Sequence, residues 1–192
     1  MSWKVKLLVL FGSPRRKGNT AALLNAFLEG AQDKKEVEIE FVNLQEKDIK
    51  PCKDCRSCRK PPYLKCIIDD DMQNLHKKVI ESDLLVLATP VYWWNISAQL
   101  KLFIDRLYAL AGEDGDYKCF NGKKIVLLMT YAGSDPNTGA KLVVDAFKCI
   151  AEYLKVDIAG VLGVCSGEVP VNKNDKALKK AFDLAEQVVT AK

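Results

Sequence analysis

The chain has 192 residues, a length typical of one domain. It is 48% hydrophobic and 28% charged, which excludes a disordered or collagen-like chain and allows a sizeable core. The net charge of +4 is too small to indicate a nucleic-acid-binding protein. Because no run approaches ~18 uninterrupted apolar residues and the N-terminus leads straight into an apolar segment, we expect no membrane association, no cleavable signal and a cytoplasmic location.

Apolar runs alternate with helical patterns along the whole chain. Five strands are predicted, at residues 5–11, 37–42, 84–88, 125–129 and 158–164. The second strand alternates apolar and polar residues as an edge strand does, whereas the third is continuously apolar, as expected of a central strand buried on both faces. The chain is therefore predicted to be a single α/β domain, a doubly wound five-stranded parallel sheet with helices on both faces.

One predicted helix follows the acidic run Asp69-Asp70-Asp71, which is interpreted as a helix cap rather than a metal site. Its periodicity places Met72, Leu75, Val79 and Ile80 inward. His76, beside Leu75, is interpreted as a surface or packing residue and not as a catalyst.

Three segments that follow strands, residues 12–20, 89–97 and 130–139, have unusual composition. In a sheet of this class ligands bind beyond the carboxyl ends of the strands. The first segment is rich in small and hydroxylated residues and leads into a helix, whose free N–H groups and dipole favour a phosphate. Its candidate ligands are Ser13, Arg15, Arg16, Gly18, Asn19 and Thr20. It matches neither a Walker loop nor a G-x-G-x-x-G fingerprint; ordinary turn and capping chemistry is the alternative.

The second segment contains three consecutive aromatic residues, Tyr92, Trp93 and Trp94, directly after a strand. Flat side chains and free backbone N–H groups suit an aromatic ring that must be stacked and hydrogen-bonded at its edge. A subunit interface explains the same residues, because tyrosine and tryptophan are enriched at interfaces.

Four of the seven cysteines, Cys52, Cys55, Cys58 and Cys66, lie close together, and this grouping calls for a metal rather than a disulfide explanation. The other three (Cys119, Cys149 and Cys165) need no function, because free cysteine behaves as a small buried hydrophobe. Basic residues surround the grouped cysteines. They form either a solvated loop or a positive rim that attracts an acidic redox partner or an anionic cofactor. These basic residues are Lys47, Lys50, Lys53, Arg56, Arg59, Lys60 and Lys65.

These motifs together resemble the NADPH-dependent FMN reductase family. The match runs in order from Gly-Ser-Pro-Arg-x-x-Gly-Asn-Thr through Cys-x2-Cys-x2-Cys and Asp-Asp-Met to Thr-Pro-Val-Tyr-Trp, followed by Lys101, Phe103, Asp105 and Arg106. It is most similar to the iron–sulfur flavoprotein branch of that family. The resemblance implies a flavodoxin-like fold, FMN, and a homodimer or tetramer with the flavin near the subunit interface.

The resemblance also assigns candidate flavin contacts by position. Ser13, Arg15, Asn19 and Thr20 would hold the phosphate. Five residues would contact the isoalloxazine ring: Pro90, Val91, Tyr92, Trp93 and Asn95. Thr130, Ala132 and Gly133, in the loop that continues to Ser134, would close over the other side of the ring.

The cysteine-rich insertion, at about residues 47–70, is the second predicted site. Cysteines at i, i+3 and i+6 allow one short loop to wrap three corners of a [4Fe–4S] cubane, and Cys66 would be the fourth ligand. The spacing also agrees with the iron–sulfur branch. An empty site and a structural zinc site are the alternatives, although zinc sites more often show two separated Cys-x2-Cys pairs.

The predicted function is an oxidoreductase in which FMN carries the chemistry and no side chain acts as a catalytic residue. With the cluster, electrons would come from a ferredoxin-like protein and pass through a relay of cluster and flavin. Without it, the activity would be NAD(P)H-dependent reduction of flavin, quinone or another small acceptor. A flavodoxin-type electron carrier and a redox- or metal-sensing protein are rivals from other classes.

Overall fold

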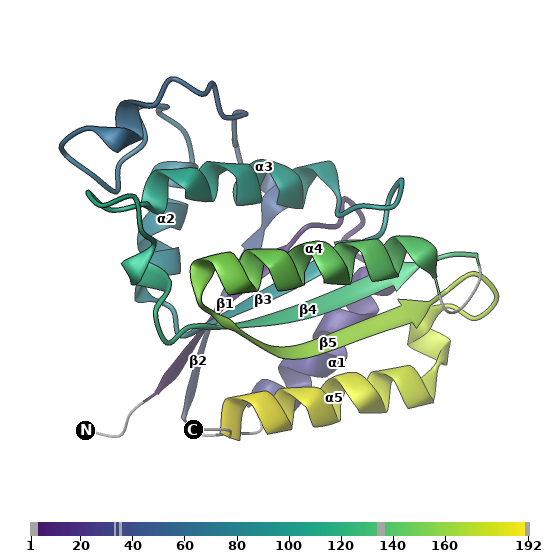
Figure 1. The fold of residues 1–192 in the computed structure, drawn as a ribbon. Coiled ribbons are helices and arrows are strands. Elements are labelled where there is room, and N and C mark those ends of the chain that lie inside the picture. Colours follow the sequence, from purple (N-terminus) through teal and green to yellow (C-terminus); the bar gives the residue numbers. More distant parts are fainter. Residues whose placement is uncertain (1–3, 33, 35, 134–136, 191–192) are drawn as a thin grey trace.

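The computed structural model of the protein describes residues 4–32, 34, 36–133 and 137–190. Its centre is a five-stranded parallel sheet with the strand order β2-β1-β3-β4-β5 (Figure 1). The strands are β1 (Val5–Phe11), β2 (Val37–Asn43), β3 (Leu84–Pro90), β4 (Lys124–Tyr131) and β5 (Asp157–Cys165). This is the flavodoxin-like order, so the predicted fold class is confirmed.

The burial of each strand follows its composition. All seven residues of the apolar strand β3 are buried, because β3 lies in the middle of the sheet and is covered on both faces. β2 is an edge strand, as its alternating sequence predicts, and its side chains from Glu38 to Phe41 are half-buried or exposed. β5 forms the other edge and is also only partly buried.

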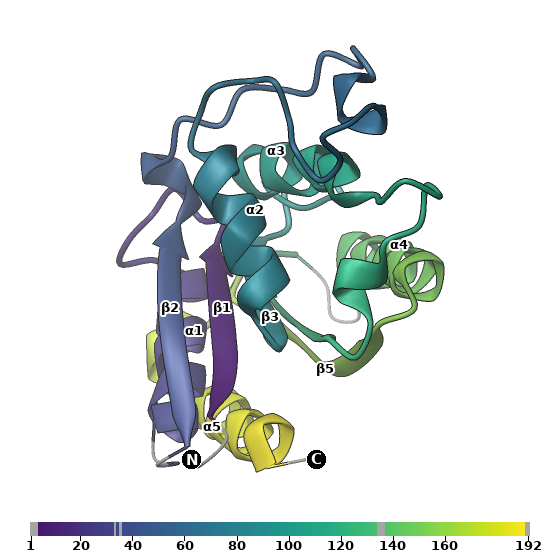
Figure 2. The same ribbon diagram turned by 90° about the vertical axis from the view of Figure 1, so that its left-hand side faces the viewer.

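Helices cover both faces of the sheet. Helices α1 (Asn19–Gln32) and α5 (Asp175–Thr190) pack together on one face, and α2 (Met72–Glu81), α3 (Ala98–Arg106) and α4 (Thr138–Leu154) lie on the other (Figures 1 and 2). Alternate residues of β1 face the two cores: Leu8 and Leu10 pack under α2 and α3, whereas Leu7 and Val9 pack against α1 and α5. Within the described residues no helix is long and apolar enough to cross a membrane.

Helix α2 corrects one detail of the sequence analysis. Met72, Leu75 and Val79 are buried as predicted, but Ile80 is 38% exposed and His76 takes the remaining inward position with 3% exposure. The four buried residues have the spacing i, i+3, i+4 and i+7, which is one stripe of a helix, and Ile80 lies one residue beyond that stripe. His76 is therefore a packing residue.

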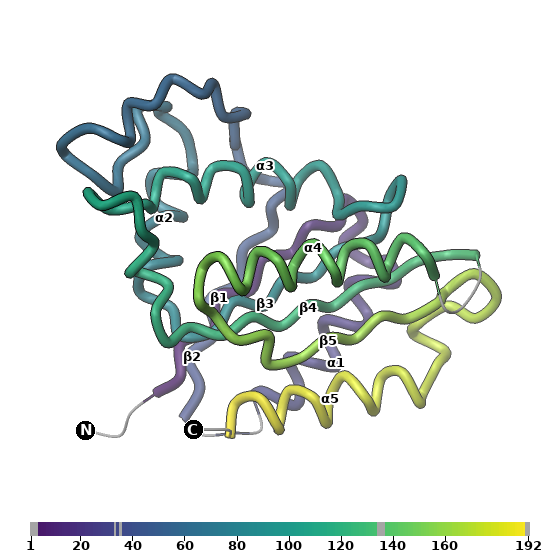
Figure 3. Tube along the Cα trace, in the orientation of Figure 1, coloured from purple at the N-terminus to yellow at the C-terminus, as the bar shows by residue number. Residues whose placement is uncertain are grey.

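The segment between β2 and α2 leaves the sheet and arches beyond α2 and α3 before it returns (Figures 2 and 3). Its cysteine-rich part, residues 50–70, contains one short 3-10 turn, Ser57–Arg59, which packs against the 3-10 turn Leu107–Leu110 at the end of α3. The remaining 3-10 turns are Leu44–Glu46, Lys118–Phe120 and Val171–Lys173. The cysteine-rich segment therefore rests on the end of α3 and not on the sheet.

Candidate functional site

Three strands bring the predicted flavin loops to one edge of the sheet. β1, β3 and β4 are parallel neighbours, with Phe11 paired to Ala88 and Pro90 paired to Thr130, so their carboxyl ends lie side by side. The chain order reverses between β1 and β3, which is the switch point where ligands of such sheets bind. Residues 12–20, 89–97 and the described part of 130–139 all start from this edge.

The start of the first loop is held rigidly against α3. The Gly12 N–H donates to the Ala88 carbonyl at 2.8 Å, and the Ser97 hydroxyl donates to the Gly12 carbonyl at 2.5 Å. A Cβ atom at Gly12 would lie 2.9 Å from Leu100 Cβ and from Ser97 Oγ, so a larger residue would push α3 away. Ser97 is also the N-cap of α3, because its side chain accepts the Leu100 N–H.

Two hydroxyl groups of the first loop are buried. Ser13 is 4% exposed and its hydroxyl accepts the Arg15 N–H at 3.2 Å, whereas Thr20 is 2% exposed and its hydroxyl lies 2.7 Å from that of Thr130. Thr20 belongs to the first turn of α1, where backbone N–H groups have no partner inside the helix. The loop therefore joins hydroxyl groups to the positive end of a helix dipole, which is the chemistry that a phosphate requires.

Two other residues predicted for the phosphate make protein contacts. The Arg16 guanidinium forms an ion pair with Glu46, at the end of the neighbouring 3-10 turn. The Asn19 carboxamide oxygen accepts the Val171 N–H at 3.0 Å and ties the loop to the connection between β5 and α5. Arg15 is exposed. Arg16 is thus paired with Glu46, whereas Arg15 forms no ion pair with another described residue.

The aromatic loop forms a tight reverse turn that projects from the protein. Tyr92 and Asn95 exchange backbone hydrogen bonds of 2.9 and 3.0 Å, and the two residues between them, Trp93 and Trp94, have φ angles of 46° and 60°. Left-handed backbone is strained for bulky residues and concentrates at functional sites. Trp93 is 89% exposed, so its ring is available to a ligand or a partner.

The base of this loop is anchored to β4. Pro90 is the buried last residue of β3, and the Val91 N–H donates to the Thr130 carbonyl at 2.8 Å. Gly139, at the start of α4, lies close beneath the loop, because a Cβ atom there would be 3.1 Å from the Trp94 Cα.

The third loop starts at Thr130, which is 4% exposed, and continues through the exposed residues Ala132 and Gly133. Ser134 lies outside the described residues. Two side chains from beyond this loop donate hydrogen bonds to its described residues. Asn137 donates to the Ala132 carbonyl at 3.0 Å, and the Cys165 thiol donates to the Gly133 carbonyl at 3.3 Å.

Ser97 and Asn137 are positioning residues that were not predicted from the sequence. Both are N-cap residues, of α3 and α4 respectively, and a serine or asparagine directly before a helical pattern is a recognisable signal.

The four grouped cysteines line one cavity. Cys52 and Cys55 are exposed, Cys58 is half-buried and Cys66 is buried, and the cavity wall opposite them comes from Arg106 and its neighbours at the end of α3. In the part of the chain that the structure describes, no three His, Cys, Asp or Glu side chains converge closely enough to hold a single metal ion. The cysteines therefore line a common space of about 20 Å³ and do not meet at a point.

The environment of these thiols is uneven. Hydrogen bonds from the backbone and side chain of Ser57 lower the pKa of the Cys55 thiol, which favours a thiolate. Burial raises the pKa of the Cys58 thiol, partly opposed by the charge of Arg59. The Arg106 guanidinium donates to Cys66 Sγ at 3.3 Å.

Arg106 and Asp70 form a buried ion pair beside the cavity. Their side chains are 1% and 0% exposed, and the guanidinium reaches both carboxylate oxygens, at 2.5 and 3.1 Å. Burial alone would raise the pKa of Asp70, but hydrogen bonds from Arg106 and from the N–H groups of Lys50 and Met72 outweigh it and lower the pKa. Asp70 therefore accepts the first N–H of α2 and also holds Arg106, whereas the N-cap residue itself, Asp71, makes no side-chain capping bond.

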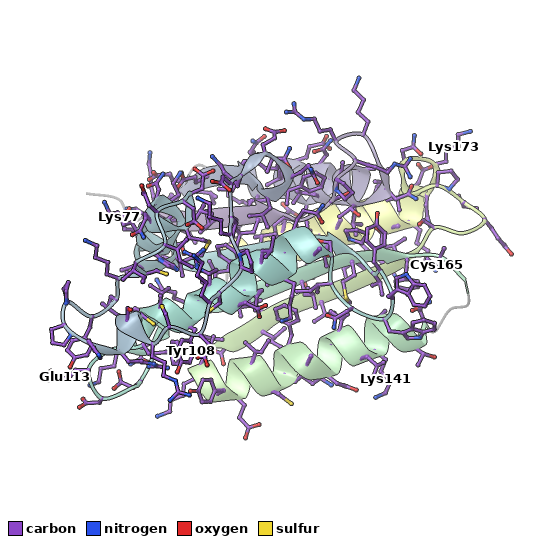
Figure 4. All side chains as sticks on the ribbon, turned by 90° about the horizontal axis from the view of Figure 1, so that it is seen from above. Lys77, Tyr108, Glu113, Lys141, Cys165 and Lys173 are labelled. Carbon is purple, nitrogen blue, oxygen red and sulfur yellow. The ribbon has the colours of Figure 1, made fainter. Side chains whose placement is uncertain are left out.

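The flavin loops and the cysteine cavity lie at different places on the molecule. Tyr108, which lines the cysteine cavity, and Cys165, which contacts the third flavin loop, are toward opposite ends (Figure 4). Helix α3 connects them, with its cap Ser97 at the flavin loops and its last residue Arg106 at the cysteines.

Comparisons with known proteins identify the family of the chain. The NADPH-dependent FMN reductase family matches residues 5–169. An iron–sulfur flavoprotein of Archaeoglobus fulgidus is 34% identical over 97% of this chain and 80% of its own length.

Solved structures show the same fold at low identity. The NAD(P)H:quinone oxidoreductase of Methanothermobacter marburgensis has a TM-score of 0.75 and 18% identity over 98% of this chain and 99% of its own. An FMN-dependent NADH-azoreductase of Bacillus anthracis in complex with FMN has a TM-score of 0.70 and 14% identity over 96% of this chain and 100% of its own. The chain therefore belongs to the NADPH-dependent FMN reductase family, in its iron–sulfur flavoprotein branch, and is an FMN-dependent oxidoreductase.

Proposed function

We propose that this oxidoreductase transfers electrons between a [4Fe–4S] cluster bound by Cys52, Cys55, Cys58 and Cys66, an FMN at the carboxyl edge of the sheet, and a small or protein acceptor. The observation that carries the cluster is the single cavity that all four cysteines line. When bound, the cluster supplies one-electron chemistry and FMN supplies both one- and two-electron chemistry.

The spacing of the cysteines supports a cluster over a zinc ion. Three cysteines at i, i+3 and i+6 allow one short loop to wrap three corners of a cubane, whereas structural zinc sites more often show two separated Cys-x2-Cys pairs. The cavity itself has a volume of about 20 Å³, which is room for about one water molecule, so the loop must open to admit a cubane.

A buried cationic group beside the cavity also suits an anionic cluster. Arg106 lines the cavity and contacts Cys66, and its Nε is buried without a hydrogen-bond partner among the described residues. An unpaired buried N–H group is costly, and an acceptor sulfur atom in the cavity would satisfy it.

Protein groups at the flavin edge fit FMN. Ser13, Thr20 and the first turn of α1 would bind the phosphate, with Arg15 adding charge. Trp93 and the backbone of residues 91–95 would support the ring. The loop from Thr130 to Gly133 would cover its other side. We expect NAD(P)H or a reduced ferredoxin-like protein as the donor.

Two surfaces support the proposed partners. The exposed aromatic turn of Tyr92, Trp93 and Trp94 is suited to a homodimer or tetramer contact, since large exposed aromatic groups mark interfaces. The exposed lysines Lys53, Lys60 and Lys65 beside the cysteines suit an acidic, ferredoxin-like protein.

The deciding experiment is anaerobic purification followed by measurement of flavin, iron, sulfide and zinc per chain. The proposal predicts FMN and no FAD, with about four irons and four sulfides. Cys52→Ala, Cys55→Ala, Cys58→Ala and Cys66→Ala should each lose the cluster and keep FMN. Cys149→Ala, on the exposed face of α4, is the matched control and should keep both.

The alternative is a cluster-free NAD(P)H-dependent FMN or quinone reductase, which the lack of converging cysteines in the described residues favours. Full flavin with no iron, together with NAD(P)H-dependent quinone turnover, would establish it. Stoichiometric zinc would make the cysteine loop a structural clamp, and absence of any turnover would indicate an electron carrier.

A further inference from the structure

The buried pair of Arg106 and Asp70 contacts both ends of the cysteine loop. At the upstream end, the Lys50 N–H donates to Asp70 Oδ2 at 3.0 Å and the Lys50 carbonyl accepts from Arg106 at 2.7 Å. At the downstream end, Arg106 Nη2 donates to Cys66 Sγ at 3.3 Å. One guanidinium thus ties the residue before the loop to its last cysteine.

A second side chain secures the downstream end. The Gln73 amide donates to the carbonyls of Cys66 and Ile68 at 2.6 and 2.7 Å. Because Gln73 and Arg106 belong to helices of the core, the base of the loop is fixed by rigid elements. The other three cysteines lie in the arch between these fixed ends.

The pair also places charge at one sulfur. Arg106 is always protonated, and its donation to Cys66 Sγ takes place in a buried site where water does not screen it. Hydrogen bonds to cysteine sulfur and local net charge set the reduction potential of an iron–sulfur cluster. A reduced cluster carries one more negative charge than the oxidised one, so a nearby cation stabilises it.

We propose that Arg106 and Asp70 are the positioning pair of the cysteine site, which close the base of its loop and set the reduction potential of the cluster through the hydrogen bond to Cys66. This inference rests on the proposed cluster. It assigns two roles to Arg106: its planar guanidinium holds the loop through hydrogen bonds, and its positive charge raises the reduction potential of the cluster. Asp70 holds the guanidinium and partly offsets its charge.

The first test is the midpoint potential of the cluster, from anaerobic redox titration of the FMN-loaded protein and its variants. Arg106→Gln should lower the potential and Asp70→Asn should raise it, because they remove opposite charges. The double variant should lie between the two. Lys148→Gln removes one positive charge from the exposed surface of α4, outside the cavity, and is the matched control; it should shift the potential less than Arg106→Gln.

The second test needs no cluster. Trypsin cleaves after exposed basic residues that are not followed by proline, and the loop offers Lys53, Arg56 and Lys65. In iron-free, FMN-bound protein, Arg106→Gln and Asp70→Asn should be cut in the loop several-fold faster than wild type. Asp145→Asn, which breaks an exposed ion pair on α4, should be cut at the wild-type rate.

Arg106→Lys separates the two roles, because lysine keeps the charge and loses the planar fork. Its loop should be cut faster, while its potential should stay closer to wild type than that of Arg106→Gln. Equal cleavage rates in all variants, or potentials of Arg106→Gln and Asp70→Asn that move in the same direction, would overturn the inference. Wild-type protein without iron would overturn the cluster instead, and the cleavage rates would still test the clamp.

Discussion

The hydroxyl oxygens of Thr20 and Thr130 lie 2.7 Å apart in a buried site, although 110 residues separate them in the sequence. Thr20 starts α1 and Thr130 is near the end of β4, so this contact crosses over the end of β3, which lies between β1 and β4. It joins the predicted phosphate loop to the predicted ring-covering loop. The two loops are therefore in direct contact.

We expect Ser13→Ala and Thr20→Val each to weaken FMN binding about 10- to 150-fold, because a hydrogen bond to a charged group contributes about 1.5–3 kcal/mol. The dissociation constant of FMN, measured by fluorescence quenching, checks this. Thr190→Ala removes a hydroxyl near the end of α5 and is the control that should leave the affinity unchanged. Unchanged affinity in Ser13→Ala and Thr20→Val would remove these residues from the phosphate site.

We expect His76 to make stability fall in mild acid. Burial lowers the pKa of His76, outweighing the hydrogen bond to the Arg106 carbonyl and the charge of Asp70, both of which raise it, while the charge of Arg106 adds to the lowering. A base with a lowered pKa binds fewer protons when folded, so its contribution to stability is full above about pH 6.5 and is lost as the pH falls from there toward the folded pKa.

Urea midpoints between pH 7.5 and 5.5 test this prediction. His76 is the single histidine of the chain, so His76→Gln should flatten this part of the curve. The same slope in the variant would show that another group is responsible.

We expect Lys123→Met to reduce the free energy of unfolding by about 1–3 kcal/mol, because it leaves buried carbonyls without a donor. The Lys123 ammonium is buried and donates to the carbonyls of Ile80, at 2.7 Å, and Ser82, which end α2. Urea denaturation measures the loss. Lys179→Met, at an exposed position of α5, should change it little, and FMN binding should survive in both variants.

We expect Trp93→Gly to leave the stability of the flavin-free protein unchanged or slightly higher, because glycine tolerates a φ of 46° that strains tryptophan. The same variant should weaken FMN binding or self-association, since the exposed ring is lost. Thermal melting and light scattering separate these effects. A large drop in melting temperature would mean that Trp93 packs within the single chain after all.

Much of the fold was predictable because it depends on local patterns. The alternation in residues 37–42 and the continuous apolar run of residues 84–88 identified an edge strand and a central strand, and the parallel arrangement then placed three loops at one edge. Ile80 was assigned inward wrongly, because periodicity does not tell which of two adjacent apolar positions faces the core.

The contacts that shape the two sites were less accessible. The pairing of Asp70 with Arg106 depends on tertiary packing, and the acidic run alone suggested only a helix cap. The left-handed backbone of Trp93 and Trp94 contradicts their intrinsic preference, so nothing in the local sequence predicts it. Arg16 was a reasonable phosphate ligand by charge, but a nearby glutamate, Glu46, competes for it.

Helix α3 has a thermodynamic consequence for FMN and for the proposed cluster. Its cap Ser97 holds the Gly12 carbonyl and its last residue Arg106 holds Cys66, and a nine-residue helix is a short rigid rod of about 14 Å. Any axial shift of this rod strains both contacts together. If binding of FMN changes the affinity of the cysteine loop for its ligand, thermodynamic linkage makes this effect reciprocal. Binding of that ligand must then change the affinity of the protein for FMN by the same factor.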